Sequence, residues 1–167
     1  SLHDALPIYE VFVVTNHKFA EHFRSWAKDA AAAHPEWRFR VFDDGTTSNA
    51  DRLGAIGDIA FVMNQAGQDG APLDDDLLVI AGDNLFSEPL LPFVETARRR
   101  GVTVGAYDVG DLELIKQYSC LRLDAEGRVV AFTEKPQHPE STLACIALYH
   151  YPRQALPLIR QYLAEGN

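Results

Sequence analysis

The chain has 167 residues, of which 47% are hydrophobic, and it carries a formal net charge of −9. A chain of this length and composition can bury a sizeable apolar core, which argues against disorder. Its 24 acidic residues against 15 basic ones argue against sequence-independent nucleic-acid binding. No apolar run approaches the length that spans a membrane, so we expect neither nucleic acid nor membrane as a partner.

The cysteines indicate the compartment. Cys120 and Cys145 form no CxxC pair and no zinc-binding pattern. In a chain of intracellular composition and without a signal-peptide pattern, such cysteines are expected to be reduced and structural. We therefore expect a cytoplasmic protein.

Strand-like and helix-like segments alternate along the chain, which is typical of an α/β sheet with parallel strands. In the first half, strands are expected over Val11–Thr15 and Trp37–Phe42, and a buried strand over Leu77–Asp83. Asn16 is expected to cap the first helix, because a side-chain oxygen there can accept from the helix start. A second helix is expected over Leu53–Met63, after a polar loop.

In the second half, Ser87 is expected to cap a helix that ends at Gly101. The remaining elements are a strand over Val102–Val109, a short helix over Asp111–Tyr118, a hairpin turning at Asp124–Gly127, a strand over Leu143–Tyr151 and a final helix from about Arg153 to Glu165. There are no repeats or linkers, so residues 9–167 are expected to form one domain. Residues 1–8 lack an initiator Met, and we expect them to be adapter-derived or cloning-derived sequence.

Asp83 is the first candidate for chemistry. It follows the apolar run Leu77–Ala81 within the tripeptide Gly-Asp-Asn. In open α/β sheets, ligands bind beyond the carboxyl ends of such strands. A carboxylate placed there can hold Mg²⁺ together with phosphate oxygens. The alternative is that Asp83 only caps the following helix.

Two further segments fall at similar junctions. Gly54 and Gly57 lie where a loop leads into a helix, where glycine allows a backbone to approach a ligand closely, although helix–sheet packing also favours small residues. Glu134 and Lys135 precede Pro136, which ends the preceding strand. Lys135 could bind a phosphate and Glu134 could accept hydrogen bonds from sugar hydroxyls, although an exposed ion pair is the simpler interpretation.

Taken in this order, these three segments resemble the sugar-phosphate nucleotidylyltransferases, most closely the glucose-1-phosphate thymidylyltransferase-like branch. The resemblance runs from Val11 to Asn167 and includes Val14–Asn16 and Ser141–Ala144. It implies a Rossmann-like three-layer nucleotidyltransferase fold with a mostly parallel mixed sheet. It also implies transfer of a nucleoside monophosphate from a nucleoside triphosphate to a sugar 1-phosphate, with release of pyrophosphate.

The resemblance also implies residue roles. Gly54 matches the glycine whose backbone lies by the nucleotide base, and Asp83 matches the catalytic aspartate that binds Mg²⁺. Glu134 and the catalytic Lys135 match the pair that contacts the sugar and its phosphate. Tyr118 and Ser119 match a segment lining the sugar pocket, where the family usually has glycine in place of Ser119. That serine is expected to crowd the sugar or to change which sugar fits.

Two segments of the family pattern have no match here. The glycine-rich loop with an arginine, which cradles the triphosphate, and the second metal-binding aspartate both fall outside this sequence. We therefore expect an internal fragment, truncated at both ends and inactive alone, of an enzyme that could be a homo-oligomer.

Two alternatives stay open from the sequence. One is a degenerate regulatory module of the same fold that binds nucleotide or sugar phosphate without turnover. The other is a metal-dependent glycosyltransferase that uses the acidic triplet Asp74–Asp76. This triplet precedes its strand instead of following it, so we interpret it as a solvated turn.

Overall fold

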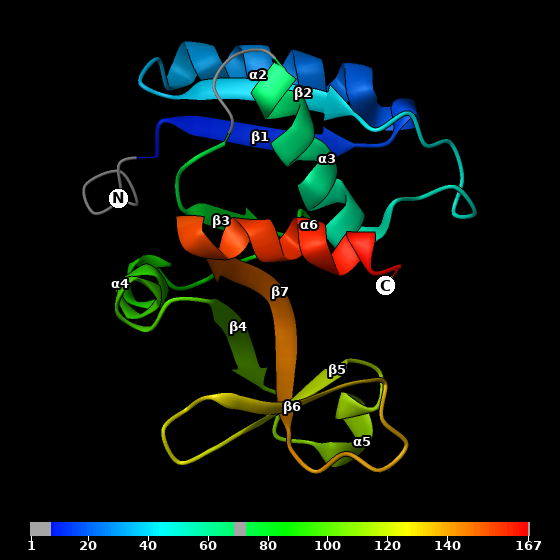
Figure 1. Cartoon of the computed structure of the whole chain (residues 1–167), viewed down its shortest axis with the longest axis vertical. Helices are drawn as coiled ribbons and strands as arrows, with labels where there is room; N and C mark the ends of the chain where they lie inside the picture. The colour runs from blue at the N-terminus through cyan, green and yellow to red at the C-terminus, as the bar shows by residue number, and fades with distance from the viewer. Residues whose placement is uncertain (1–7, 69–72, 167) are drawn as a thin grey trace. The chain divides into compact units, whose positions relative to one another are not determined.

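The computed structural model describes residues 8–68 and 73–166, which form two compact parts. The first part comprises the chain up to Asp75 together with the segment from Ala155 onward, and the second runs from Asp76 to Gln154. Each part has its own sheet (Figure 1). Of the residues expected to be adapter-derived, all except Ile8 lie outside the described residues.

The first part is built on two parallel strands. β1 (Glu10–Thr15) and β2 (Arg38–Asp43) pair along their whole length, from Glu10 beside Arg38 to Thr15 beside Asp43. Parallel neighbours need a crossover connection, and α2 (Ala20–Ala33) supplies it and packs on the pair (Figure 1). The carboxyl ends of both strands therefore lie at the same edge of this sheet.

Helices complete the first part. The short helix η1 (His17–Phe19) starts at Asn16, whose side-chain oxygen accepts from the Phe19 N–H, so the predicted cap is confirmed. α3 (Gly54–Gln68) packs against α6 (Leu156–Ala164), which follows η2 (Arg153–Ala155). The buried apolar side chains of these two long helices are Ile59, Ala60, Val62, Met63, Ala66, Leu156 and Ile159.

The second part is a five-stranded sheet with two helices. Its strands are β3 (Leu77–Ile80), β4 (Thr103–Asp108), β5 (Ser119–Leu123), β6 (Val129–Glu134) and β7 (Leu143–Tyr151). Its helices are α4 (Leu91–Arg100) and α5 (Leu112–Ile115). α5 covers a small core in which Ile115, Cys120 and Ala144 are buried against Val109.

β7 organises this sheet, because β3, β4 and β5 all pair with it in the antiparallel sense. β3 and β4 both pair with Tyr149 and His150, so they occupy opposite edges of β7. β4 and β5 both pair with Leu143 and Ala144, so these two strands also lie on opposite edges of β7. It follows that β3 and β5 share one edge of β7, one after the other.

Between the part of β7 that pairs with β3 and the part that pairs with β5, the strand departs from regular geometry at Ala147, whose φ is +50°. This left-handed conformation is unfavourable for a residue with a Cβ. The register of β4 on β7 also shifts there, between Val104 and Ala106. On the other edge, the carbonyl oxygens of Ile146 and Ala147 accept hydrogen bonds from the segment that follows β3.

The expected mixed α/β fold is confirmed, and β7 has the predicted bounds. Two expectations for single elements were wrong. β3 is half-buried at the edge of its sheet and pairs with an antiparallel strand, whereas a fully buried parallel strand was expected. Ser87 caps nothing, because α4 begins after Leu90, which makes no side-chain cap hydrogen bond.

Two other features agree with the sequence. Gly101 ends α4 with φ +90° and donates its N–H to the Ala97 carbonyl oxygen. Cys120 and Cys145 are both free thiols. Within residues 8–68 and 73–166, no helix combines the length and the apolar character needed to cross a lipid bilayer.

The kink in β7 gives a stability prediction. Ala147→Gly removes the left-handed strain, whereas Ala144→Gly, in a regular and buried part of the same strand, only adds backbone entropy to the unfolded state and loses a packed methyl group. Each effect is worth about 1 kcal/mol. We expect Ala147→Gly to be more stable than Ala144→Gly by about 1–2 kcal/mol in urea unfolding, and equal losses would show that Ala147 is unstrained.

Candidate functional site

In the first part, a pocket of about 470 Å³ opens at the carboxyl ends of β1 and β2. Ligands of α/β sheets characteristically bind at such an edge. Its wall is mostly polar, and the hydroxyl and amide side chains that line it are Thr15, Asn16, Thr46, Thr47, Ser48 and Asn49. Two cations, Lys18 and Arg52, and two carboxylates, Asp44 and Asp58, also line the pocket.

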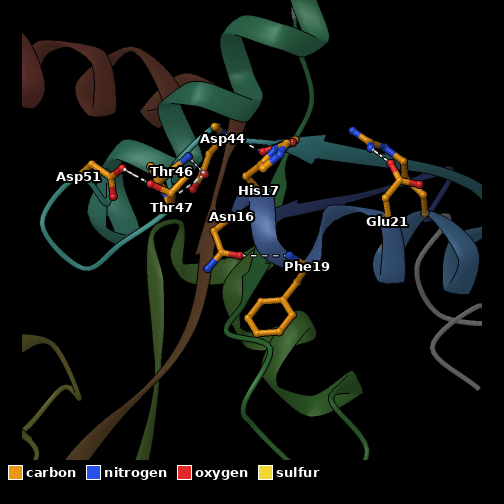
Figure 2. Close-up of polar contacts among 11 residues, drawn as sticks. Asn16, His17, Phe19, Glu21, Asp44, Thr46, Thr47 and Asp51 are labelled. Carbon is orange, nitrogen blue, oxygen red and sulfur yellow. Dashed lines mark hydrogen bonds and ion pairs between the residues drawn. The ribbon is translucent and has the colours of Figure 1, made fainter.

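Backbone hydrogen bonds hold the loop after β2 against the end of β1. The N–H of Asp44 donates to the Thr15 carbonyl oxygen, and the N–H of His17 donates to the Thr46 carbonyl oxygen, both at 3.0 Å. The N–H and the hydroxyl of buried Thr46 both donate to Asp44 Oδ1 at 2.7 Å (Figure 2). These bonds hold one wall of the pocket in a fixed conformation.

Asp51 stabilises the same loop through hydrogen bonds. Its carboxylate accepts hydrogen bonds from the N–H and the hydroxyl of both Thr47 and Ser48, at 2.8–3.2 Å. Because these donors stabilise the charged form, led by the Thr47 and Ser48 N–H groups, they lower the pKa of Asp51 to about 2. Figure 2 shows Thr47 and Asp51 facing one another. Asp51 is therefore a structural carboxylate.

Asp58, in the first turns of α3, differs from Asp51 because one of its carboxylate oxygens lacks hydrogen-bond donors. Its Oδ1 atom is buried and has no hydrogen-bond partner. Burial raises the pKa of this carboxyl group, and the nearby charge of Asp44 adds to the effect. Asp58 was not predicted as a site residue from the sequence, although a carboxylate between Ile56 and Ile59 on an apolar helix is a signal that could have found it.

Gly54 is the first residue of α3, with φ +76°, and an added Cβ would meet no atom within 4 Å. Its glycine identity is therefore required by the backbone conformation and not by crowding. Asp58 lies four residues later, one helical turn along the same helix. The role of Gly54 beside a nucleotide base stays a prediction.

In the second part, four of the predicted site residues come together. Ser119, at the start of β5, pairs with Glu134, at the end of β6, and the Ser119 hydroxyl donates a hydrogen bond to Glu134 Oε2. The Lys135 N–H donates to the Tyr118 carbonyl oxygen at 3.0 Å. Lys135 itself has φ +43°, which turns the chain sharply away from β6.

Asp83 lies in the turn after β3, exposed and next to Asn84, which anchors the turn. The Asn84 side-chain amide donates to the Ile146 carbonyl oxygen at 2.7 Å, and the Ala81 N–H donates to the Ala147 carbonyl oxygen at 3.0 Å. β5 begins its pairing with β7 on this same edge, at Ala144. The end of β3 and the start of β5 therefore face the same short stretch of β7.

Two side chains near this stretch were missed from the sequence. The Cys145 thiol lies 3.4 Å from the Tyr149 hydroxyl, and Tyr149 stacks on Tyr151. Burial, the contact with Cys145 and the charge of Glu134 raise the pKa of Tyr149, so its hydroxyl stays protonated.

The acidic side chains do not form a ready metal site in the described part of the chain. Within the described ranges, no three His, Cys, Asp or Glu side chains gather into a metal-binding cluster. Asp76, from the acidic triplet, instead accepts from the Arg153 N–H at 2.9 Å and lies 3.4 Å from His150 Nε2. The triplet precedes β3, so the interpretation as a glycosyltransferase metal motif has no support in its placement.

Comparison with known proteins identifies the family. Residues 5–167 match the family model described as nucleotidyl transferase, and the chain belongs to this family. The resemblance inferred from the three short segments is thereby confirmed.

The alignments with individual relatives cover only part of this chain and a smaller part of each relative. The chain is 31% identical to a glucose-1-phosphate adenylyltransferase of Thermomicrobium roseum over 83 residues, which are 48% of this chain and 19% of that one. It is 31% identical to a glucose-1-phosphate thymidylyltransferase of Neisseria meningitidis over 93 residues, 53% of this chain and 31% of that one. The matched regions therefore span about a fifth to a third of these relatives' length.

A solved structure supports the fold. A putative glucose-1-phosphate thymidylyltransferase from Bacillus anthracis, in complex with a sucrose, is similar with a TM-score of 0.69 and 19% sequence identity. The similarity covers 89% of this chain and 55% of that one. At this identity, it shows that the two proteins share a fold.

Asp51 and Asp58 are predicted to change the stability of the first part in opposite directions as the pH changes. Because Asp51 has a folded-state pKa of about 2, below its usual 3.8, its charge adds stability above pH 4, and this stability is lost as the pH falls toward 2. Because the pKa of Asp58 is raised, its ionisation removes stability as the pH rises from about 4 through the folded-state pKa.

At pH 7, Asp51→Asn should therefore lower the urea midpoint, and Asp58→Asn should raise it. The Asp51→Asn difference should shrink as the pH falls from about 4 toward 2, whereas the Asp58→Asn difference should shrink as the pH falls through the raised folded-state pKa of Asp58 toward about 4. Urea unfolding followed by circular dichroism between pH 2 and pH 7 measures them. A destabilised Asp58→Asn variant at pH 7 would show that Oδ1 has a partner in solution.

Proposed function

We propose that this chain belongs to an enzyme that transfers a nucleoside monophosphate from a nucleoside triphosphate to a sugar 1-phosphate, giving a nucleotide sugar and pyrophosphate. The observation that supports the proposal is that the turn containing Asp83 is anchored to the same short stretch of β7 at which β5 begins its pairing, close to the Ser119–Glu134 pair, in a member of the nucleotidyl transferase family. A cytoplasmic location is part of the proposal and agrees with the two free thiols.

In the proposed reaction, a phosphate oxygen of the sugar 1-phosphate attacks the α-phosphorus of the nucleotide. The bond from the α-phosphorus to the oxygen that bridges it to the β-phosphorus breaks, and pyrophosphate leaves with the electron pair. Both substrates are anions, so the protein has to position them and offset their repulsion. Lys135, on its sharp turn after β6, is assigned to the sugar phosphate.

Glu134 is assigned to the sugar hydroxyls. The Ser119 hydroxyl occupies Glu134 Oε2, which leaves Oε1 available as an acceptor. The sequence predicted that Ser119 would crowd the sugar or change which sugar fits, and this stays a prediction. Because the Ser119 hydroxyl donates a hydrogen bond to Glu134, we also assign Ser119 to positioning the carboxylate. Tyr118, held through its carbonyl oxygen by Lys135, is assigned to the wall of the same subsite.

Mg²⁺ is the proposed cofactor, and the donor set fits it in part. Asp83 offers one exposed carboxylate on an anchored turn. Mg²⁺ is usually held by one or two carboxylates while phosphate oxygens and water complete its shell. Asp83 would thus hold an ion that arrives with the triphosphate, and the ion would supply charge neutralisation when bound.

The first test is a pyrophosphate-release assay with Mg²⁺, the common nucleoside triphosphates and several hexose 1-phosphates. A longer chain that includes coding sequence from both sides should release pyrophosphate only when a sugar 1-phosphate is present. The 167-residue chain should release none. If the longer chain binds both substrates without releasing pyrophosphate, the degenerate binding module is the correct interpretation, and turnover by the short chain would show that the site is misplaced.

In the longer chain, Asp83→Asn and Lys135→Ala should fail differently. Asp83→Asn removes one charge from the metal ligand, and losing one preorganised interaction of this kind costs roughly 10²–10³ in kcat. Lys135→Ala removes the counter-charge of the sugar phosphate, and a charged hydrogen bond is worth about 1.5–3 kcal/mol, so KM for that substrate should rise about 10- to 100-fold.

Lys116→Ala is the matched control, because Lys116 pairs with Glu113 on the exposed side of α5. It should leave both constants unchanged. Steady-state kinetics with each substrate and Mg²⁺ varied separately distinguishes the roles. Rescue of Lys135→Ala but not of Asp83→Asn by high Mg²⁺ would mean that the two assignments are reversed.

A further inference from the structure

One side of α2 carries large apolar side chains that the structure leaves exposed. Phe19 at the start of the helix, Phe23 and Trp26 have exposed fractions of 44%, 39% and 48%. Ala30 and Ala33 continue the same side toward the end of the helix. These five residues, which we call the α2 stripe, follow one another at intervals of four and three residues, which is the spacing of a coiled-coil seam.

The α2 stripe is distinct from the side of the helix that forms the core of the first part. The buried residues of α2 are Ala20 and Ala27. Trp26 is nevertheless held in place, because its ring meets Phe39 of β2 and Phe23 edge-on, with centroids 5.6 Å and 6.5 Å away. Exposed apolar stripes mark interaction surfaces, and a large aromatic side chain at their centre typically supplies much of the binding energy.

We propose that the α2 stripe is the contact surface for a second copy of this chain, through antiparallel packing of the two α2 helices about a twofold axis. This inference is independent of the proposed reaction. The side chains of the stripe are large in its first half and small in its second half. Antiparallel packing places Phe19 against the partner's Ala33, and Phe23 against the partner's Ala30. The two copies of Trp26 meet at the axis, so large side chains fill the space beside small ones.

The charges beside the stripe favour the same arrangement. His22 and Asp29 are seven residues apart, so they flank the stripe on the same side. In the antiparallel pair, each His22 faces the partner's Asp29 and can donate a hydrogen bond to it. In a parallel pair, Asp29 would face its own copy, and like charges repel. Among the described residues, neither side chain has an ion-pair partner in its own chain, so both are available.

A lipid surface fits the stripe less well than a second copy does. Helices that lie on membranes carry Lys and Arg on their polar face and are attracted to anionic lipids. Asp29 flanks the stripe here, and the net charge of −9 opposes binding to an anionic surface. Ala30 and Ala33 also offer little apolar bulk to a bilayer, whereas they leave room for the phenylalanines of a partner.

The first test is sedimentation velocity of the 167-residue chain over a range of concentrations. Contact through one helix per copy belongs to the small interfaces, below about 1,200 Å², which are typical of weak association. We therefore expect a dissociation constant on the order of 10–100 μM, with monomer predominant at about 5 μM and dimer at about 500 μM. This measurement needs no variant and so does not depend on the folding of one.

Ala33→Arg should weaken dimerisation at least about 10-fold, because the new side chain occupies the space of the partner's Phe19. The fold should be retained, since Ala33 is exposed and a cation at the last residue of α2 suits the helix dipole. The matched control is Ala32→Arg, which makes the same change one residue earlier, at an exposed position on another side of the helix, and should keep the dimer.

An exchange of large and small side chains tests the antiparallel register. Phe19→Ala and Ala33→Phe should each weaken dimerisation, whereas the double variant should restore the wild-type dissociation constant to within about threefold. A double variant no better than the single ones would overturn the register. A chain that stays monomeric at about 500 μM, or a dimer that responds equally to Ala32→Arg and Ala33→Arg, would overturn the proposal. A monomer that binds phosphatidylserine vesicles would also overturn it and assign the stripe to lipid.

Discussion

The arrangement of strands in the second part depends on one strand, β7. It pairs with other strands on both of its edges, and it is kinked at Ala147. Where the kink interrupts the ladder between β3 and β5, two carbonyl oxygens of β7 become available, and the chain after β3 takes both of them. A buried backbone acceptor needs a partner, so the turn that contains Asp83 is fixed at this point. The start of β5 and the end of β6 then bring Ser119 and Glu134 to the same edge. The candidate site is thus a consequence of how β7 meets its hydrogen-bonding requirements.

The first part shows how the same residue type takes different roles in one loop and helix. Asp51 accepts four hydrogen bonds and fixes the loop, whereas Asp58 keeps a buried oxygen without a partner. Stability alone would favour the first arrangement everywhere, because an unpaired buried acceptor is costly. At Asp58, burial without a partner disfavours the charged form and raises the pKa of the carboxyl group.

Much of the fold could be predicted from local sequence signals. Asn16 and Gly101 were identified as helix ends because cap geometry depends on one side chain or on one positive φ, and β7 was recognised from its continuous apolar run. The direction of the pairing of β3 could not be predicted, because an apolar run reads the same in a parallel and in an antiparallel sheet. The cluster of Ser119 and Glu134 was inferred only through family resemblance. The position of Asp58 on an apolar helix was a sequence signal, but its unpaired oxygen is a property of three-dimensional packing, and the strain at Ala147 has no sequence signature at all.

The most direct test of this account asks whether the end of β3 and the ends of β5 and β6 form one site. Backbone amide signals of the isotopically labelled chain can be followed by NMR during titration with glucose 1-phosphate in the presence of Mg²⁺. The account predicts that the signals of Gly82–Asn84 and those of Tyr118, Ser119, Glu134 and Lys135 shift together with one dissociation constant. Shifts confined to one of these segments, or shifts that follow different dissociation constants, would contradict it.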